Sequence, residues 1–426
     1  MSTHHDLTFE TLDIHATEGP MAAKVAAYGD AWHRGFHEGS LSDKQRDWWL
    51  EHSRTDDVTL RAAYASTSLV ADPPPVGTFT SWTGGINVGA GALLPLHMIT
   101  DVTVAPTHRR RGILNRLMTE DLTDAAARGL PLAALTVSEG GIYGRFGFGV
   151  ATRQRMVEVD TGPGRFRVRD AEDDGSLQLL ELPQARPHVE RVFAGHLAET
   201  RGAVSRPAFY GQIEEGHDWE GGGKDTKSRV VVHLDAAGEV DGYARFQHKE
   251  EGEGSQRGVV ELRGMHALTD RAWRRLWGFL ADIDLAHVVK TRVPVDTPLH
   301  LAVTDPRVVR TTGLVDFLWV RVLDVVAALE ARPWREDATV VLEVRDRMGF
   351  ADGRFRVTTE KGRAGVERTQ DEPGVTLDAE TLGALYLGDQ PVTVHAAAGR
   401  VHGTDVDTFA AMADHAGPSP WCSTGF

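Results

Sequence analysis

The chain has 426 residues, enough for about three compact domains at the usual ~100–200 residues per domain. Its 41% hydrophobic and 25% charged residues are typical of globular proteins and exclude a disordered, collagen-like or coiled-coil chain. With 46 basic and 61 acidic side chains, the net charge of −15 would repel a phosphate backbone, so nucleic acid is not expected as a partner and cationic substrates are favoured.

The sequence shows no segment typical of export or of a membrane span. The N-terminal residues lack a basic segment followed by an apolar run. No stretch reaches the ~18–20 uncharged apolar residues of a membrane-spanning helix. The single cysteine, Cys422, excludes an intrachain disulfide and a cysteine-rich metal site, as is usual in a reducing compartment. We therefore expect a cytoplasmic protein with no membrane span and no metal cofactor.

The first third of the chain predicts two helices within residues 20–53, the second beginning after Ser42. Strands are predicted at residues 58–65, 76–83 and 96–104. Apolar residues then recur at helical spacing over 113–126, and this amphipathic helix ends at Gly129. A buried strand at 132–137 follows. The order of strand, turn, helix and strand predicts one βαβ-like unit.

Beyond a glycine-rich segment at 138–149, a strand is expected at 153–159, and Thr161-Gly162-Pro163-Gly164 marks a domain boundary. The next part predicts helices at 183–200 and 269–282 and strands near 228–234, 239–247, 258–266 and 286–292. The last part predicts helices at 324–331, 378–387 and 404–414 and strands near 338–345, 353–359 and 391–395. The fold class expected is α+β or mixed α/β, in three domains at residues 1–162, 163–318 and 319–426.

The turn Arg109-Arg110-Arg111-Gly112 is the strongest candidate for a binding site. It joins the strand ending at Val104 to the amphipathic helix, so that arginines surround a helix N-terminus. The N–H groups and positive dipole end of a helix favour a pyrophosphate. Residues 101–155 contain eight Lys/Arg and five Asp/Glu, whereas residues 1–60 contain five and eleven. An anionic cofactor is expected at the first segment and a cationic substrate at the second.

Residues 104–114, Val-Ala-Pro-Thr-His-Arg-Arg-Arg-Gly-Ile-Leu, resemble the acetyl-CoA pyrophosphate loop of GNAT-superfamily N-acetyltransferases, whose usual pattern is Arg/Gln-x-x-Gly-x-Gly/Ala. Arg109 and Gly112 match this pattern, whereas Leu114 stands where a small residue is expected. The segment 138–149, Ser-Glu-Gly-Gly-Ile-Tyr-Gly-Arg-Phe-Gly-Phe-Gly, and an aromatic C-terminal residue extend the likeness. With these features the chain resembles the enhanced intracellular survival (Eis) acetyltransferases of actinobacteria.

The resemblance implies an N-terminal GNAT domain, a degenerate second GNAT-like domain and a C-terminal sterol-carrier-like domain, assembled as a homo-hexamer. It implies acetyl-CoA as acetyl donor, Tyr143 as general acid and the Phe426 α-carboxylate as general base. The residues implied in acetyl-CoA binding are Val102, Val104, Arg109, Arg110, Gly112, Ile113, Ser138 and Gly140. Some family members carry an acidic residue before the C-terminal aromatic, where this chain has Gly425.

The expected reaction is direct acetyl transfer to a primary amine of a small cationic acceptor, such as an aminoglycoside or another polyamine. As the amine attacks, the departing thiolate, of pKa about 8.5, must gain a proton that a tyrosine can supply. An α-carboxylate of pKa about 3.5 is a weak base for an amine unless binding lowers the amine's pKa or a water relays the proton. The alternatives are a protein-lysine acetyltransferase and, in another class, a lipid- or sterol-binding carrier.

Each candidate residue also has a structural interpretation. Tyr143 suits a core position beside Phe146, and the C-terminal segment suits a frayed tail, although its Trp and Phe favour docking into a pocket. His33 and His37 have zinc-compatible spacing in a helix but no evident third ligand, so surface or pocket histidines are the better interpretation. No His–Asn/Asp arrangement can be assigned to Cys422, which is therefore expected to be a packing residue.

Overall fold

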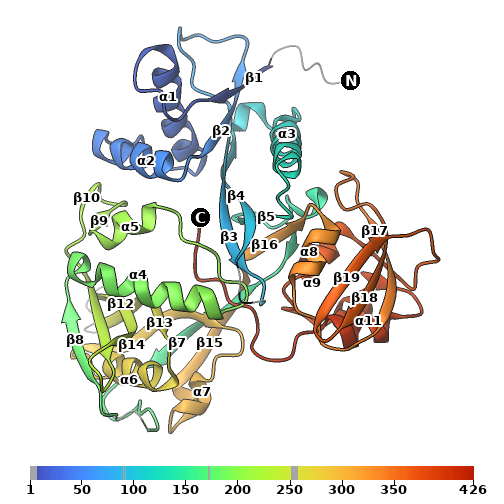
Figure 1. Cartoon of the computed structure of the whole chain (residues 1–426). Coiled ribbons are helices and arrows are strands. Elements are labelled where there is room, and N and C mark those ends of the chain that lie inside the picture. Colours follow the sequence, from blue (N-terminus) through green and yellow to red (C-terminus); the bar gives the residue numbers. More distant parts are fainter. Residues whose placement is uncertain (1–6, 90, 92, 171–172, 251–257) are drawn as a thin grey trace.

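The computed structural model describes residues 7–89, 91, 93–170, 173–250 and 258–426; the segment considered for export, residues 1–6, lies outside them. The chain forms three lobes, each built on its own β-sheet (Figure 1). No helix in these ranges is long and apolar enough to cross a bilayer.

The first sheet contains seven strands in the order β1-β2-β3-β4-β5-β16-β6. Their bounds are β1 Leu7–Leu12, β2 Thr59–Ala65, β3 Gly77–Asn87, β4 Leu93–Val104, β5 Leu132–Thr136, β16 Leu318–Val322 and β6 Gly149–Val150. All neighbouring strands are antiparallel except β4 and β5, which are parallel and joined through helix α3, Ile113–Ala127. The expected βαβ unit is therefore present.

Helices cover both faces of the first sheet. Helices α1, Gly19–Gly35, and α2, Asp43–Thr55, lie on one side, where Tyr28 of α1 packs in the same core as Trp82 of β3. Helix α3 covers the other side through a separate apolar core. Ser42 caps α2 as expected, because its hydroxyl accepts from the Gln45 N–H and the Gln45 side chain accepts from the Ser42 N–H.

The second sheet has the order β15-β7-β14-β13-β12-β11-β8. Its strands are β15 Val309–Asp316, β7 Arg153–Asp160, β14 Ala286–Pro294, β13 Gly258–Ala267, β12 Val240–Glu250, β11 Ser228–Leu234 and β8 Ser176–Leu180. Helix α4, Leu182–Glu199, packs on one face, and α6, Asp270–Ala281, packs on the other. The short elements are α5 Phe209–Glu214, α7 Leu299–Ala302, β9 His217–Asp218, β10 Gly223–Lys224 and the 3₁₀ turns Pro106–His108, Gly144–Phe146 and Pro306–Val308.

The third sheet has the order β19-β18-β17-β20-β21. Its strands are β19 Arg363–Arg368, β18 Gly353–Glu360, β17 Thr339–Arg345, β20 Val375–Asp378 and β21 Val401–His402. The accompanying helices are α8 Val325–Ala331, α9 Ala379–Leu385, α10 Val392–Ala397 and α11 Val406–Ala413. The strand expected near 391–395 is wrong: Val392 and Val394 favour a strand locally, but Pro391 precedes a helix whose first N–H donates to Asp414.

Hydrogen bonding between strands crosses the boundaries expected at residues 162 and 318. Strand β7, before the first of these positions, lies in the second sheet, and β16, which begins at the second, lies between β5 and β6 in the first sheet. Helix α9 of the third lobe packs on β16 and β6 so closely that a Cβ atom at Gly149 would lie 2.0 Å from the Glu380 carbonyl oxygen. The first and third lobes consequently share one apolar core.

Candidate active site

The turn between β4 and α3 has the form of an anion-binding loop. Arg110 and Gly112 adopt left-handed backbone conformations, with φ of 63° and 78°. Gly112 precedes α3 without any side-chain cap, and Arg109–Gly112 are exposed. The first N–H groups of α3 are thus left for water or a ligand, and the helix dipole and neighbouring guanidiniums favour a phosphate group there. Ile113 anchors this turn in the core, with 2% of its surface exposed.

Strands β4 and β5 separate next to this loop. Their parallel pairing runs from Leu96 opposite Leu132 to Ile99 opposite Leu135. Strand β4 continues to Val104, whereas β5 ends at Thr136. The edge of β4 that carries Val102 and Val104 is therefore not paired with β5, which leaves backbone groups there available to an extended ligand.

A β-bulge at Asp101, a residue that the sequence motifs do not point to, lies where the strands separate. Its φ is 51°, and the pairing of β3 with β4 shifts between Thr78 and Thr80. The Thr80 hydroxyl donates to the Asp101 carboxylate at 3.1 Å. Burial raises the pKa of Asp101 to about 7, although Thr80 and the nearby His33 oppose the shift. The signal in the sequence is a lone acid in the strand segment Ile-Thr-Asp-Val-Thr-Val.

Ser138, Gly140 and Tyr143 lie in the segment directly after β5. Ser138 and Gly140 are exposed, whereas Tyr143 is buried in the core on the α3 side of the sheet. The backbone carbonyl of Tyr143 accepts from the Phe146 and Phe148 N–H groups, which fixes the turn. Burial, with a contribution from Glu139, raises the pKa of Tyr143 to about 12. Its hydroxyl therefore keeps its proton at neutral pH.

The C-terminal segment leaves the third lobe and runs between the first two, where it ends near the centre of the molecule (Figure 1). The Trp421 N–H donates to the Arg201 carbonyl at 2.8 Å, and the Gln154 side chain donates to the Cys422 carbonyl at 2.8 Å. Cys422 is fully buried, and burial raises the pKa of its thiol to about 12, so it is a packing residue and not an exposed thiolate. Docking of the tail, expected from its aromatic residues, is confirmed.

The last two residues are held beside the end of β5. The Thr136 hydroxyl donates to a terminal oxygen of Phe426 at 2.5 Å. The Phe426 ring packs edge-on against Trp82 of β3, with ring centroids 5.7 Å apart. The Tyr210 hydroxyl accepts from the Gly425 N–H at 2.9 Å and donates to the Gly425 carbonyl at 3.3 Å. The terminal carboxylate thus lies where β4 and β5 separate, on the α1 side of the sheet.

The residues predicted from the sequence accordingly lie in the segments around the point where β4 and β5 separate. Val102 and Val104 follow the bulge in β4, the arginine turn follows β4, and Ser138 to Tyr143 follow β5. Among the described residues, no group of three His, Cys, Asp or Glu side chains could hold a metal ion. His33 instead makes a 2.5 Å hydrogen bond to the Gly39 carbonyl, and His37 lies in a left-handed turn.

Family models match three successive parts of the chain. Two acetyltransferase (GNAT) domain models match residues 30–151 and 202–322, and a sterol carrier protein domain model matches residues 325–423. The chain thus consists of two GNAT domains followed by a sterol-carrier domain, which confirms the fold class expected from the resemblance.

Individual relatives cover most of the chain. An uncharacterized N-acetyltransferase of Streptomyces avermitilis is 36% identical, covering 82% of this chain and 86% of its own. The N-acetyltransferase Eis of Mycobacterium tuberculosis is 34% identical, and the match covers 75% of this chain and 77% of that protein. The crystal structure of Eis1 from Mycobacterium abscessus superposes with a TM-score of 0.79 over 99% of this chain and 100% of that chain, at 29% sequence identity.

Proposed function

Because the chain belongs to the Eis family of N-acetyltransferases, we propose that it transfers the acetyl group of acetyl-CoA directly to a primary amine of a small cationic acceptor. In this reaction the amine nitrogen attacks the thioester carbon, the carbon–sulfur bond breaks, and the amine proton leaves as the thiolate is protonated. An N-acetylated amine and free coenzyme A are the products. The observation that carries the proposal is the Phe426 carboxylate beside the end of β5.

Acetyl-CoA would lie along the free edge of β4. The backbone of Val102 and Val104 would hold the pantetheine arm, and Arg109, Arg110, Gly112 and Ile113 would hold the pyrophosphate. Support comes from the uncapped N-terminus of α3 and the left-handed conformation of two loop residues. Ser138 and Gly140, both exposed after β5, would lie near the thioester.

Tyr143 would act as the proton donor to sulfur. With a pKa of about 12, its phenol is protonated throughout the physiological range. The departing thiolate, of pKa about 8.5, is a weaker base than the phenolate, so the hydroxyl would stabilise the developing charge chiefly by donating a hydrogen bond. Tyr143 lies on the α3 side of the sheet and Phe426 on the α1 side, which suits a donor and an acceptor of protons at opposite sides of one thioester.

The acceptor amine would be bound and deprotonated by carboxylates. The Phe426 α-carboxylate would take the proton, directly or through a water. Asp101 would bind an ammonium group of the same acceptor, since it lies at the bulge beside Thr80 and is half ionised near pH 7. An acceptor with several amines suits both contacts, and the surplus of acidic residues over 1–60 would attract it.

Thiol release from acetyl-CoA in the presence of an amine panel tests the proposal. The panel contains an aminoglycoside, a linear polyamine, a lysine-containing peptide and a neutral alcohol as control. We expect acceptor-dependent thiol release with the first two and an N-acetylated product by mass spectrometry. Thiol release that no amine stimulates would contradict acetyl transfer to amines, and preference for the peptide would favour a protein-lysine acetyltransferase.

The sterol-carrier domain match over residues 325–423 supports one further candidate function, a lipid or sterol carrier. Its sheet packs apolar residues of β17 and β18 into the same core as the first lobe. Organic extraction of purified protein followed by mass spectrometry distinguishes the two functions. Stoichiometric lipid without any amine acetylation would favour the carrier.

A further inference from the structure

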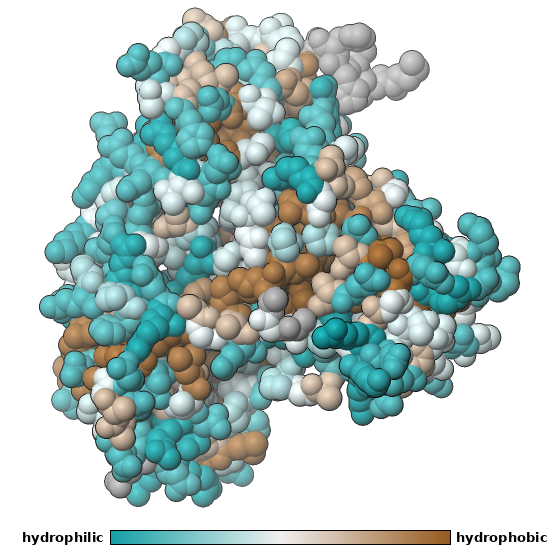
Figure 2. Space-filling view, in the orientation of Figure 1, coloured by the Kyte–Doolittle hydropathy of each residue, from teal (hydrophilic) through white to brown (hydrophobic). Residues whose placement is uncertain are grey.

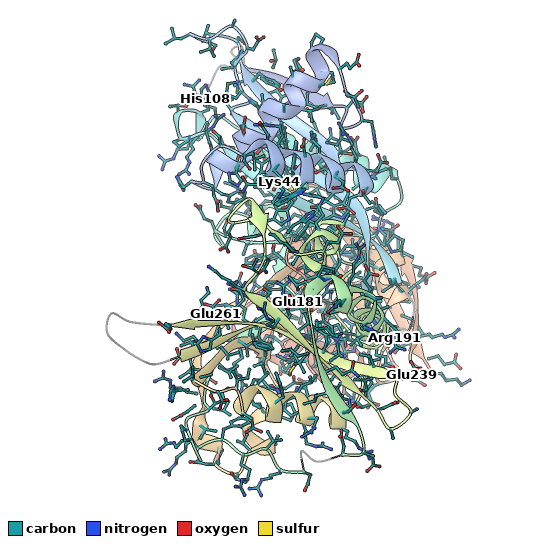
Figure 3. All side chains as sticks on the ribbon, turned by 90° about the vertical axis from the view of Figure 1, so that its left-hand side faces the viewer. Lys44, His108, Glu181, Arg191, Glu239 and Glu261 are labelled. Carbon is teal, nitrogen blue, oxygen red and sulfur yellow. The ribbon has the colours of Figure 1, made fainter. Side chains whose placement is uncertain are left out.

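The second domain contains a large cavity to which the proposed acetyl transfer assigns no role. Its volume is about 1230 Å³, and it lies over the α4 face of the second sheet. Helices α4 and α5, strands β12 to β14 and the C-terminal segment all contribute to its walls. Figure 3 shows Glu261 of β13 in the same lower lobe as Glu181, which precedes α4, and Arg191, in the middle of α4; Lys44 of the first domain lies above them.

The inner part of this cavity contains two arginines and one carboxylate. The Arg206 guanidinium donates to Glu214 at 2.8 Å and to the Tyr243 hydroxyl at 2.9 Å, and it stacks over the Tyr210 ring at 4.8 Å. Arg245 lies two residues after Tyr243 on β12, so its side chain emerges on the same face of the sheet. Glu214 therefore contacts Arg206, whereas no carboxylate of the described residues contacts Arg245.

Arg245 forms neither a hydrogen bond nor an ion pair with any residue that the structure describes. Asp225 is the acidic group that acts on it, but the Asp225 carboxylate already accepts from the Lys227 and Ser228 N–H groups at 2.9 Å. Burial lowers the pKa of the Arg245 guanidinium. Guanidiniums withdrawn from water are normally paired, because desolvating an unpaired charge is unfavourable.

The histidines and tyrosines around the two arginines are neutral at pH 7. Burial lowers the pKa of His196 to about 4 and that of His266 well below its usual value. Tyr210 and Tyr243 keep their protons because burial raises their pKa values. The His196 Nε2 and Arg206 Nε atoms are buried without a hydrogen-bond partner. The two guanidiniums thus share this inner region with the Glu214 and Asp225 carboxylates, and the N–H groups of Arg245 remain unused for hydrogen bonding among the described residues.

We propose that this cavity binds a small organic anion, with its carboxylate or phosphate group on the Arg245 guanidinium and its apolar part among the aromatic side chains of the lining. Phe209, Tyr210 and Tyr243 supply that apolar surface. The site reaches the catalytic region through Tyr210, which lines the cavity and holds both backbone groups of Gly425. A bound anion would therefore restrain the residue preceding the terminal carboxylate.

Calorimetric titration with salicylate and with phenyl phosphate tests the proposal, with salicylamide as the uncharged control. We expect at least one of the two anions to bind wild-type protein and salicylamide to bind at least about tenfold more weakly. Arg245→Met should weaken anion binding by about tenfold or more, whereas Arg263→Met should not, because Arg263 pairs with Glu261 at 2.7 Å on the outer part of the cavity. Arg110→Ala should also bind normally, which separates this site from the phosphate loop.

The melting temperature without ligand distinguishes binding from a structural role. Arg245→Met should melt at or above the wild-type temperature, since it removes an unpaired, desolvated charge, and Arg245→Lys should retain part of the anion binding. Absence of binding by both anions, equal binding by Arg245→Met, or a lowered melting temperature of unliganded Arg245→Met would each overturn the proposal. None of these outcomes depends on acetyl transfer, which is measured separately.

Discussion

Asp101 combines a left-handed backbone with a carboxyl group of pKa about 7. It lies just beyond the part of β4 that pairs with β5. If it binds an acceptor ammonium, Asp101→Asn should raise the KM for the amine, and the ratio of wild-type to variant kcat/KM should rise as pH increases through 7. The measurement is a pair of pH–rate profiles from about pH 6 to about pH 8. A constant ratio would exclude ionised Asp101 from acceptor binding.

The raised pKa of Asp101 also predicts how the stability of the fold depends on pH. Because the folded pKa lies above the unfolded value of 3.8, the folded state binds the proton more tightly, and Asp101 destabilises the protein progressively as pH rises toward 7. Asp101→Asn should therefore gain melting temperature relative to wild type on going from about pH 5 to about pH 8. A relative loss over that interval would mean that the carboxylate is stabilised in the fold.

Tyr143→Phe removes a hydroxyl and leaves the aromatic packing with Phe148 in place. We expect kcat to fall by on the order of 10²-fold, with the KM for acetyl-CoA nearly unchanged, because the lost hydrogen bond forms mainly in the transition state. Steady-state kinetics with both substrates varied measures this. Wild-type turnover would reduce Tyr143 to a core residue.

At the scale of elements, the turn into α3 predicts a selective defect in donor binding. Arg109→Ala and Arg110→Ala should each raise the KM for acetyl-CoA by about tenfold or more, since a charge-assisted contact to phosphate contributes about 1.5–3 kcal/mol. Arg116→Ala is the matched control, because Arg116 pairs with Glu120 along α3 at 2.7 Å. Equal donor dependence in all three variants would remove the phosphate-loop assignment.

The C-terminal segment predicts intolerance to extension. Additional residues would convert the Phe426 carboxylate into an amide at the position that the Thr136 hydroxyl contacts. A C-terminal tag should lower kcat strongly while the melting temperature changes little, because the anchoring contacts of Trp421 and Cys422 lie upstream. Turnover of tagged and tag-free protein is compared at matched oligomeric state. Equal rates would assign proton acceptance to Asp101 or to a water chain.

The whole molecule is held together by contacts between its lobes as well as within them. Figure 2 shows apolar residues gathered in the central region where the lobes meet, with hydrophilic residues around the outer surface of the view. The shared core of the first and third lobes and the strand β16 between β5 and β6 make the site depend on all three. Isolated domains are therefore expected to lose activity.

We also propose that the active species is a homo-hexamer, as the family resemblance implies. Sedimentation of active protein should give about six times the chain mass of 46.5 kDa. Sedimentation during turnover, with product detection in the moving boundary, ties the assembly to activity. Full activity at the mass of one chain would contradict this proposal.

The sequence by itself determined the local elements and the site segments. The 113–126 periodicity, the Ser42 cap and the arginine turn depend on neighbours a few residues apart, so helices α2 and α3 and the loop between β4 and α3 could be recognised directly. The family resemblance then added the two GNAT domains and the sterol-carrier domain, which periodicity alone does not identify.

Only the tertiary structure decided which distant segments meet. Phe426 reaches Thr136 across 290 positions, and β16 enters the first sheet from beyond the whole second domain. Asp101 became a half-buried, left-handed bulge residue because β3 pairs around it, and Arg245 became a guanidinium without a contacting carboxylate among the described residues because β12 lies beneath α4 and α5. These features arise from long-range strand pairing and desolvation, whose energies depend on residues that local patterns do not bring together.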